Sequence, residues 1–372
     1  MTLPAESRIR IAQPQLGSQE IEAVTRVINS GMLASGPEVK AFEKEFSAYV
    51  GSRYACAVNN GTSALSLALS SIGIKPGDEV ITTPMTFVAT ANAIISCGAV
   101  PVFADIDEAT FNLCPESTKS RITEKTAAIM PVHLYGLAAN MPAFRKLADE
   151  HGLYLIGDAA QAHGAAIGDS NVGTLADIEC FSFYPTKNMT TGEGGMVTTN
   201  DTDLHAMLDS VRNHGRPDAS LGKYDHVRFG LNLRMTDLGA AIGREQLKRV
   251  NEFNTRRAAN ATTFNAELQG IEGLVTPTVP TGYTHAWHQY TLRCKDRAGL
   301  KETLEALDIE TRMYYPTLVK DYPHLKAFAS PCPVAEMVVD EVISLPVHPG
   351  LSEDDVTRIV EAVRAWEQDL KR

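Results

Sequence analysis

Short apolar segments alternate with helical segments over residues 54–213 of the chain. Seven apolar segments have the composition of buried strands, and they cover residues 54–58, 79–82, 100–103, 127–132, 153–156, 178–183 and 196–199. Helical patterns separate most of them, at residues 63–72, 86–97, 141–151 and 202–213. This alternation predicts a mostly parallel sheet covered by helices on both faces. Ligands of such sheets bind beyond the carboxyl ends of the strands, so the residues after each strand are candidates for function.

The rest of the chain follows a different pattern. A long helical stripe at residues 236–268 precedes a Gly-, Pro- and Thr-rich connection at residues 270–284. Strands are then predicted at 285–294, 310–315 and 342–346, with helices at 297–307 and from Glu353 onward. We therefore expect an α/β protein. A large domain (residues 1–250), with a mostly parallel seven-stranded sheet between helices, would be joined to a smaller C-terminal α+β domain (residues 251–372).

The composition is typical of a globular enzyme. Of the 372 residues, 44% are apolar and 21% are charged, and the formal net charge is −11. Nucleic-acid-binding surfaces are usually basic, so this balance argues against such a partner. We expect a cytoplasmic protein without a membrane segment, because the N-terminus lacks an apolar signal core. The uncharged stretch 86–104 divides into a helix and a strand around Gly98 and Pro101.

Neither a metal site nor a disulfide framework is expected. The spacing of His133, His163 and His214 does not match a metal-binding motif, and the chain has no Cys-x-x-Cys pair. The six cysteines are far apart, at positions 56, 97, 114, 180, 294 and 332, and free thiols in a reducing compartment account for them.

One lysine stands alone just after a predicted strand. Lys187 is the only Lys or Arg between Lys146 and Arg212, and it follows the aromatic segment 181–184. Glycines at positions 192, 194 and 195 then allow the backbone to turn tightly or to approach a ligand. Partial loss of hydration would lower the pKa of this amine and prepare it for Schiff-base chemistry. The alternative is a solvated loop lysine, which is favoured when this segment is considered alone.

Three other strand ends carry groups that bind ligands. Gly61, Thr62 and Ser63 lie between a strand and a helix, which is typical of an anion site, or Thr62 or Ser63 simply caps the helix. Phe87 presents a ring that either stacks on a flat cofactor or belongs to the core. Asp158 needs a cationic partner such as a pyridinium nitrogen, or serves as a helix N-cap. Together with the lysine, these groups match the needs of pyridoxal 5′-phosphate.

The same segments give the chain a specific resemblance to a known family. From about Gly31 to Gly350 it resembles the vitamin-B6-dependent sugar aminotransferases of the DegT/StrS type, which have the aspartate-aminotransferase (fold type I) architecture. The resemblance is carried by Asn60-Gly61-Thr62-Ser63-Ala64-Leu65, Thr86-Phe87-Val88-Ala89-Thr90, Pro131-Val132-His133-Leu134-Tyr135-Gly136, Asp158-Ala159-Ala160-Gln161-Ala162-His163-Gly164, Phe181-Ser182-Phe183 with Lys187-Asn188, Gly192-Glu193-Gly194-Gly195 and Asn232-Leu233-Arg234-Met235. One departure is Gly157, where many relatives carry an acidic residue, and it leaves Asp158 in register.

The resemblance implies a role for each candidate residue. Lys187 would hold pyridoxal 5′-phosphate through a Schiff base, and Asp158 would pair with its ring nitrogen. Phe87 would stack on the ring, and Gln161 would lie near the phenolic oxygen. The phosphate would be held by Gly61, Thr62, Ser63 and Ser182. Asn232 would reach the phosphate in the neighbouring subunit, so the working unit would be a homodimer with shared sites.

The resemblance also implies a ping-pong transamination. An amino acid, with L-glutamate as the expected donor, would convert the cofactor to pyridoxamine 5′-phosphate. That form would then aminate a keto group of a nucleotide-linked deoxysugar in amino-sugar biosynthesis. One alternative is a sugar dehydratase of the same fold, although such relatives have histidine in place of Lys187. The other is a catalytically silent regulatory relative.

A basic stretch precedes the Asn232 motif. It contains Arg212, His214, Arg216, Lys223, His226 and Arg228. An acidic protein that binds an anionic sugar nucleotide must supply positive charge locally, so this stretch is a candidate for holding the diphosphate. A solvated surface loop is the alternative.

Overall fold

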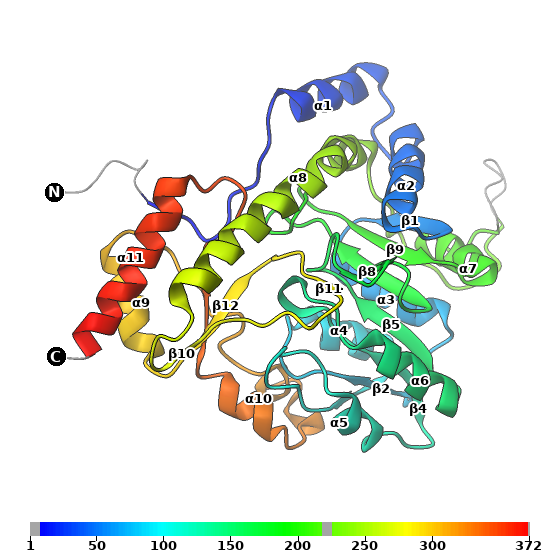
Figure 1. Ribbon diagram of the computed structural model, residues 1–372. Helices are drawn as coiled ribbons and strands as arrows, with labels where there is room; N and C mark the ends of the chain where they lie inside the picture. The colour runs from blue at the N-terminus through cyan, green and yellow to red at the C-terminus, as the bar shows by residue number, and fades with distance from the viewer. Residues whose placement is uncertain (1–7, 218–224, 371–372) are drawn as a thin grey trace.

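The central element is a seven-stranded sheet in the order β1-β9-β8-β5-β4-β2-β3 (Figure 1). The computed structural model describes residues 8–217 and 225–370. The strands of this sheet are β1 (Tyr54–Val58), β2 (Glu79–Thr82), β3 (Val100–Phe103), β4 (Thr126–Met130), β5 (Tyr154–Asp158), β8 (Ile178–Ser182) and β9 (Gly195–Thr199). Strand β9 runs antiparallel to both of its neighbours, whereas the pairs from β8 to β3 are parallel. The predicted mostly parallel sheet is therefore confirmed.

Helices cover both faces of the sheet, as the apolar composition of its strands predicts. Side chains that alternate along β1 separate into two cores: Cys56 and Val58 pack with α3 (Gly61–Ser71), while Ala55 and Ala57 pack with α2 (Pro37–Val50). The first core also includes residues of α4 (Ala89–Ser96) and α7 (Thr202–Arg212). On the opposite face, α6 (Met141–His151) covers β4 and β5 through Phe144.

Helix α8 (Asp237–Leu268) connects the sheet to the C-terminal part of the chain (Figure 1). Ala240 and Val250, in its first half, belong to the core beneath the sheet. Phe264 and Leu268, in its last turns, belong to the C-terminal core. Helix α1 (Ser18–Ser30) packs on the start of α8 through Ala23 and Val27. The expected division at residue 250 falls inside this continuous helix, and it stays a prediction.

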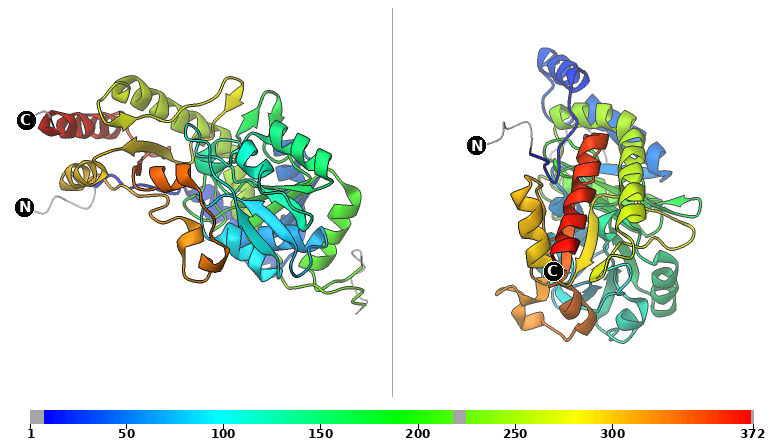
Figure 2. Two further views of the ribbon diagram at one scale, coloured as in Figure 1. Left: turned by 90° about the horizontal axis from the view of Figure 1, so that it is seen from below. Right: turned by 60° about the vertical axis from the view of Figure 1, so that its left-hand side comes forward.

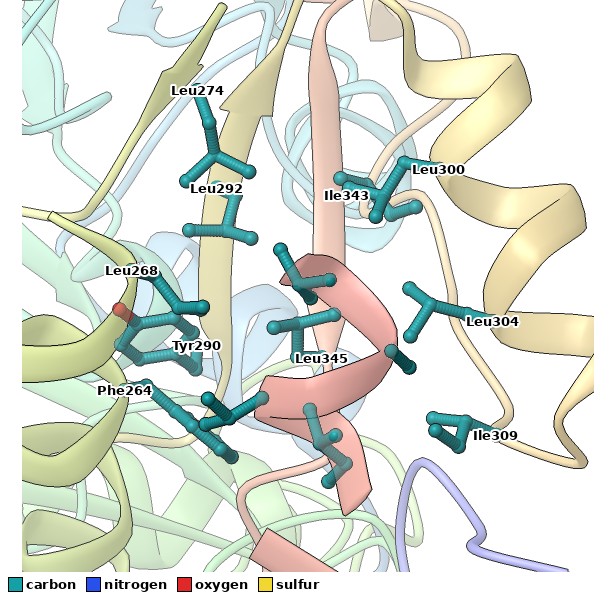
Figure 3. Packing of buried hydrophobic residues seen from close by; sticks show 14 of the residues in the cluster. Phe264, Leu268, Leu274, Tyr290, Leu292, Leu300, Leu304, Ile309, Ile343 and Leu345 are labelled. Atoms are coloured by element: carbon teal, nitrogen blue, oxygen red, sulfur yellow. The ribbon is translucent and has the colours of Figure 1, made fainter. Parts of the chain in front are cut away.

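The C-terminal part is built on a three-stranded antiparallel sheet. Its strands are β10 (Leu274–Val275), β12 (Tyr290–Cys294) and β13 (Val342–Leu345). Helices α9 (Arg297–Ala306) and α11 (Glu353–Leu370) pack on it, and Figure 2 shows them side by side at the end of the molecule far from α7. The core between these elements is aliphatic and aromatic; Figure 3 shows Phe264, Leu292, Leu300 and Leu345 within it. This packing is the expected small α+β unit.

Shorter elements complete the described chain. They are α5 (Pro115–Lys119), α10 (Pro333–Val338), the 3-10 turns η1 (Leu134–Gly136), η2 (Val319–Asp321) and η3 (Lys326–Phe328), and a small sheet of β11 (Tyr283–Thr284), β6 (Ala166–Ile167) and β7 (Ser170–Asn171). Across residues 8–217 and 225–370, no helix combines the length and the apolar composition that crossing a bilayer requires.

Two predicted strands are wrong in part. The strand expected at 285–294 begins only at Tyr290, because Trp287 has a positive φ of 48° and bends the backbone before it. The segment 310–315 is not a strand, since its pairing with β13 is limited to one bridge between Arg312 and Ser344. The segment is instead irregular, and it brings Tyr315 to the wall of a large cavity.

Candidate functional site

A cavity of about 1380 Å³ lies at the carboxyl ends of β1, β2, β5 and β8. Most of the predicted site residues line it, namely Gly61, Thr62, Ser63, Phe87, Asp158, Gln161, Ser182 and Lys187. Asn232 does not, although Leu231 and Leu233 on either side of it do. The rule that ligands bind at the carboxyl ends of parallel strands therefore found the cavity from the strand pattern.

The start of α3 forms an anion-binding cradle in this cavity. Asn60 caps the helix by accepting the Ser63 N–H at 2.8 Å, so the expectation that Thr62 or Ser63 is the cap is wrong. A Cβ at residue 61 would lie 2.7 Å from Ser182 Cβ and 3.0 Å from Ser182 Oγ. Only glycine therefore allows the Ser182 hydroxyl to approach the helix N-terminus, where free N–H groups and the helix dipole favour a negative charge.

Asp158 is a buried carboxylate at the end of β5, with 4% of its surface exposed. Burial raises its pKa, while hydrogen bonds from the Thr90 hydroxyl (2.8 Å) and the Ala160 N–H (3.2 Å) and the charge of Lys187 act in the opposite direction. It does not cap a helix, since the chain turns through residues 159–164 instead. Its backbone is held by Pro131 O and His133 N–H.

Lys187 lies between β8 and β9 and reaches the same cavity. Loss of hydration lowers its pKa to about 8, and the charge of Asp158 partly opposes this shift. The amine is therefore neutral far more often near neutral pH than a surface lysine, which is what a nucleophile or a proton carrier requires. The sequence analysis expected a lowered pKa for this amine, and the environment of Lys187 agrees with that expectation.

An aromatic ring and an amide complete the predicted set. Phe87 keeps 55% of its surface exposed at the cavity, so its ring is available for stacking and is not a core side chain. Gln161 is buried, and its Oε1 accepts the Tyr135 N–H at 2.8 Å. Its Nε2 donates to the Tyr315 hydroxyl at 3.2 Å.

Some cavity residues were missed by the sequence analysis. Thr90 supports Asp158 and is itself within 2.9 Å of the Thr86 hydroxyl. The i, i+4 spacing of these threonines at the start of a helix was the available signal. Tyr315 and His288 also line the cavity, but they come from the C-terminal part and carry no local signal. Their positions follow from tertiary packing alone.

The departure at Gly157 has a structural explanation. Gly157 is paired with Glu179 on the neighbouring strand, and a Cβ at 157 would lie 2.8 Å from Glu179 Oε1 and 2.9 Å from His133 Nε2. His133 Nδ1 accepts the Ala139 N–H, so the ring proton is on Nε2 and is donated to Glu179 at 3.2 Å. Glu179 thus occupies the space that a side chain at 157 would need.

Among the described residues, no three His, Cys, Asp or Glu side chains are arranged to hold a metal ion. His163 is fully buried between Phe181 and Phe183, and burial lowers its pKa to about 3. Members of the basic stretch lie in different environments. Arg212 forms ion pairs with Glu43 and Asp209, whereas Arg228 lines the cavity. Lys223 lies outside the described residues.

Comparison with known proteins identifies the group of enzymes to which this arrangement belongs. The sequence profile of the DegT/DnrJ/EryC1/StrS aminotransferase family matches residues 14–364. The chain belongs to this family. As a member it is an aminotransferase, and the resemblance inferred from the motifs is confirmed.

Proteins of other organisms match the chain in sequence and in structure. The spore coat polysaccharide biosynthesis protein SpsC of Bacillus subtilis (strain 168) is 41% identical over 370 residues, covering 94% of this chain and 95% of that protein. The dTDP-3-amino-3,4,6-trideoxy-alpha-D-glucose transaminase of Streptomyces venezuelae is 39% identical over 362 residues, with 96% and 94% covered. The crystal structure of S. venezuelae DesV in complex with a ketimine intermediate has a TM-score of 0.91 and 39% identity, with 94% and 95% covered.

Aminotransferases of this family use pyridoxal 5′-phosphate, and the cavity fits that cofactor. The cradle at Gly61 offers N–H and hydroxyl donors to a phosphate, and its geometry depends on the absence of a side chain there. Asp158 is a buried carboxylate suited to a ring nitrogen, and Lys187 is an amine of lowered pKa. The donor set therefore matches both charged ends of the cofactor.

Proposed function

We propose that this aminotransferase moves an amino group from an amino acid, with L-glutamate as the donor, to a keto group of a nucleotide-linked deoxysugar. One observation carries the proposal: Lys187 and Asp158 line the same cavity as the Gly61–Ser182 cradle. Relatives support the substrate class, since one is named as a dTDP-aminosugar transaminase and another as a polysaccharide biosynthesis protein. The product would enter amino-sugar biosynthesis.

In this proposal the chain binds both the phosphate and the ring of pyridoxal 5′-phosphate. Gly61, Thr62, Ser63 and Ser182 hold the phosphate through N–H and hydroxyl donors at the start of α3. Phe87 and Gln161 line the cavity, where the ring of Phe87 would stack on the cofactor and the amide of Gln161 would hold its phenolic oxygen. When bound, the cofactor supplies an aldehyde for amine exchange and a ring that accepts electrons.

Two residues then handle protons. Asp158 would hold the ring nitrogen and keep a proton there, because a buried carboxylate is stabilised by a cationic partner. Lys187 Nζ, with its pKa lowered to about 8, accepts the proton from the α-carbon of the amino acid and delivers it to the cofactor. In the second half-reaction the same amine carries the proton in reverse, which leaves the sugar aminated.

The working unit in this proposal is a homodimer with shared sites. Asn232 is exposed and does not line the cavity of its own chain, which agrees with a role in the partner's site. Phe229 and Leu231 beside it are 79% and 46% exposed, and such apolar exposure is typical of an interface. Arg228 lines the cavity and is the member of the basic stretch placed to contact a diphosphate.

The proposal places the enzyme in the cytoplasm. All six cysteines are free thiols, including the partly exposed Cys97 and Cys114, and this is typical of proteins from a reducing compartment. The dehydratase alternative is not favoured, because Lys187 is present where those relatives have histidine.

The experiment that tests the proposal is covalent trapping. Protein incubated with pyridoxal 5′-phosphate is reduced with borohydride and mapped, and the label should lie on the peptide that contains Lys187. Lys187→Ala should lose the label and both half-reactions with L-glutamate and a keto-sugar nucleotide, falling by at least about 10³-fold. Lys125→Ala, a change at the surface, is the matched control. A catalytically silent relative would trap no cofactor, and normal turnover by Lys187→Ala would refute the assignment.

A further inference from the structure

The orientation of the Gln161 amide is fixed by a backbone donor. The Tyr135 N–H can only donate, so the Gln161 atom at 2.8 Å from it is the oxygen. The nitrogen of the same amide therefore faces the Tyr315 hydroxyl at 3.2 Å. Gln161 donates one N–H to Tyr315 and retains a second N–H at the cavity wall.

This assignment determines the direction of the Tyr315 hydroxyl. Because its oxygen accepts from Gln161, its hydrogen must be donated elsewhere, and no acceptor for it occurs in the described part of the chain. Tyr315 lines the cavity, and its ring lies 6.0 Å from the ring of Phe87. Its hydroxyl is close enough to Asp158 for that charge to raise its pKa, with burial as the larger cause.

Two donors thus converge on one place. The Gln161 nitrogen and the Tyr315 oxygen are 3.2 Å apart, so a single acceptor oxygen can lie within hydrogen-bond distance of both. Both line the same cavity as Phe87 and Asp158, which would define the face and the nitrogen edge of the bound ring in the proposed function. We propose that Tyr315 is a second donor, alongside Gln161, to the phenolic oxygen of the bound cofactor. This inference rests on the proposed function.

Tyr315 would favour the ionised form of that oxygen. A donor stabilises an anion more than its protonated form, so the donor lowers the pKa of the lysine-linked cofactor. Tyr315 comes from the C-terminal part of the chain, whereas Gln161 follows β5 of the large sheet. The proton affinity of the cofactor would therefore depend on contact between these two parts.

The test is a pH titration of the absorbance band of the wild-type holoenzyme and of Tyr315→Phe. Loss of the hydroxyl should raise the apparent pKa of the band, increasing proton affinity by about tenfold or more. The dissociation constant of pyridoxal 5′-phosphate should rise as well. Tyr54→Phe, which loses a hydroxyl contact with Thr202 at the opposite end of β1, should titrate like the wild type.

A second substitution changes the donor while it keeps the ring. Incorporation of 3-fluorotyrosine at position 315 makes the hydroxyl a stronger donor, so the pKa of the band should fall, opposite to the effect of phenylalanine. If the titration curve of either variant overlies the wild-type curve, the role of Tyr315 is overturned, whereas the proposed function is not affected. If the wild-type protein forms no band with pyridoxal 5′-phosphate, both this inference and the proposed function are overturned.

Discussion

Thr90 holds the carboxylate on which the proposed chemistry depends. Its hydroxyl donates to Asp158 Oδ2 at 2.8 Å, so the Thr86 hydroxyl, 2.9 Å away, donates to Thr90 in turn. These side chains are buried, and no water competes for them in the way it would at the surface. The two threonines therefore keep the Asp158 carboxylate in one orientation and favour its ionised form.

We expect Thr90→Val to raise the pKa of Asp158, because it removes a donor that opposes the effect of burial. Pyridoxal 5′-phosphate should then bind roughly tenfold more weakly, as the loss of one hydrogen bond to a charged group predicts. Equilibrium dialysis of the cofactor measures this change. Thr90→Ser keeps the hydroxyl and should restore affinity; if serine and valine bind equally, the hydrogen bond has no such role.

Gly157 is required by the pair of side chains beside it. A methyl group there would meet Glu179 Oε1 at 2.8 Å and His133 Nε2 at 2.9 Å, and both side chains are fully buried. Gly157→Ala should lower the free energy of unfolding by about 1–3 kcal/mol, since the buried pair cannot move without losing its hydrogen bonds. Chemical denaturation measures the change.

Gly239→Ala is the matched control for Gly157→Ala. The nearest atoms to a Cβ at residue 239 are 3.6 Å away, and the residue lies in the first turns of α8. Alanine should therefore be neutral or stabilising there, by up to about 1 kcal/mol. Equal effects of the two substitutions on the free energy of unfolding would show that the contact with Glu179 does not cause the loss of stability.

At the scale of helices, α2 and α8 are joined by one carboxylate. Asp237 is the first residue of α8 and is 1% exposed. Its Oδ1 accepts the N–H groups of Gly36 and Val39, at 2.8 and 3.0 Å, and so caps the start of α2 from a distant part of the chain. Gly36 itself has no side chain that could do this.

Asp237→Ala should destabilise the fold by about 2–4 kcal/mol, because a buried N–H group and a partly buried one lose their acceptor. Asp203→Ala provides the control, since Asp203 lies in the first turn of α7 and is exposed. Thermal unfolding of both variants tests this expectation. Equal melting temperatures for the two variants would contradict the capping role.

Strands that are encoded by a local apolar pattern could be predicted from the sequence, whereas contacts between distant segments, such as the cap formed by Asp237, could not. Strands such as β1 and β2 are short apolar runs, and their burial is encoded locally, so all seven were found. Lys187 and Asp158 follow such strands and were found with them. Tyr315 was predicted to be in a strand, but its segment pairs with β13 only at the bridge between Arg312 and Ser344, and β13 pairs with β12 instead. Contacts between distant segments decide such cases, and local pattern does not report them.

At the scale of the whole molecule, residues from both parts of the chain line the cavity that contains Lys187. The lysine lies in the segment that joins β8 and β9 of the large sheet, while Tyr315 and His288 enter the cavity from the C-terminal part. Folding of both parts is therefore needed to remove water from the amine, which is the cause of its lowered pKa. A group that is perturbed only in the folded state makes stability depend on pH.

The sign of that dependence follows from the direction of the shift. The pKa of Lys187 is about 8 in the folded protein against 10.5 for the unperturbed amine, so between these values the unfolded chain binds more protons. Its contribution to the free energy of unfolding must then rise with pH across this window. Below pH 8 both states are protonated, and the lysine is destabilising by a constant amount.

We expect Lys187→Met to stabilise the cofactor-free protein, and the gain over the wild type should shrink as the pH rises from 8 to 10.5. Denaturation of both proteins at several pH values measures the difference between their free energies of unfolding. Other titrating groups, such as buried cysteines, contribute equally to both proteins and cancel in this difference. Lys125→Met controls for the loss of an exposed amine. A gain that stays constant with pH would mean that the amine keeps its full hydration in the fold. Its lowered pKa, and with it the proton transfer assigned to Lys187, would then be wrong.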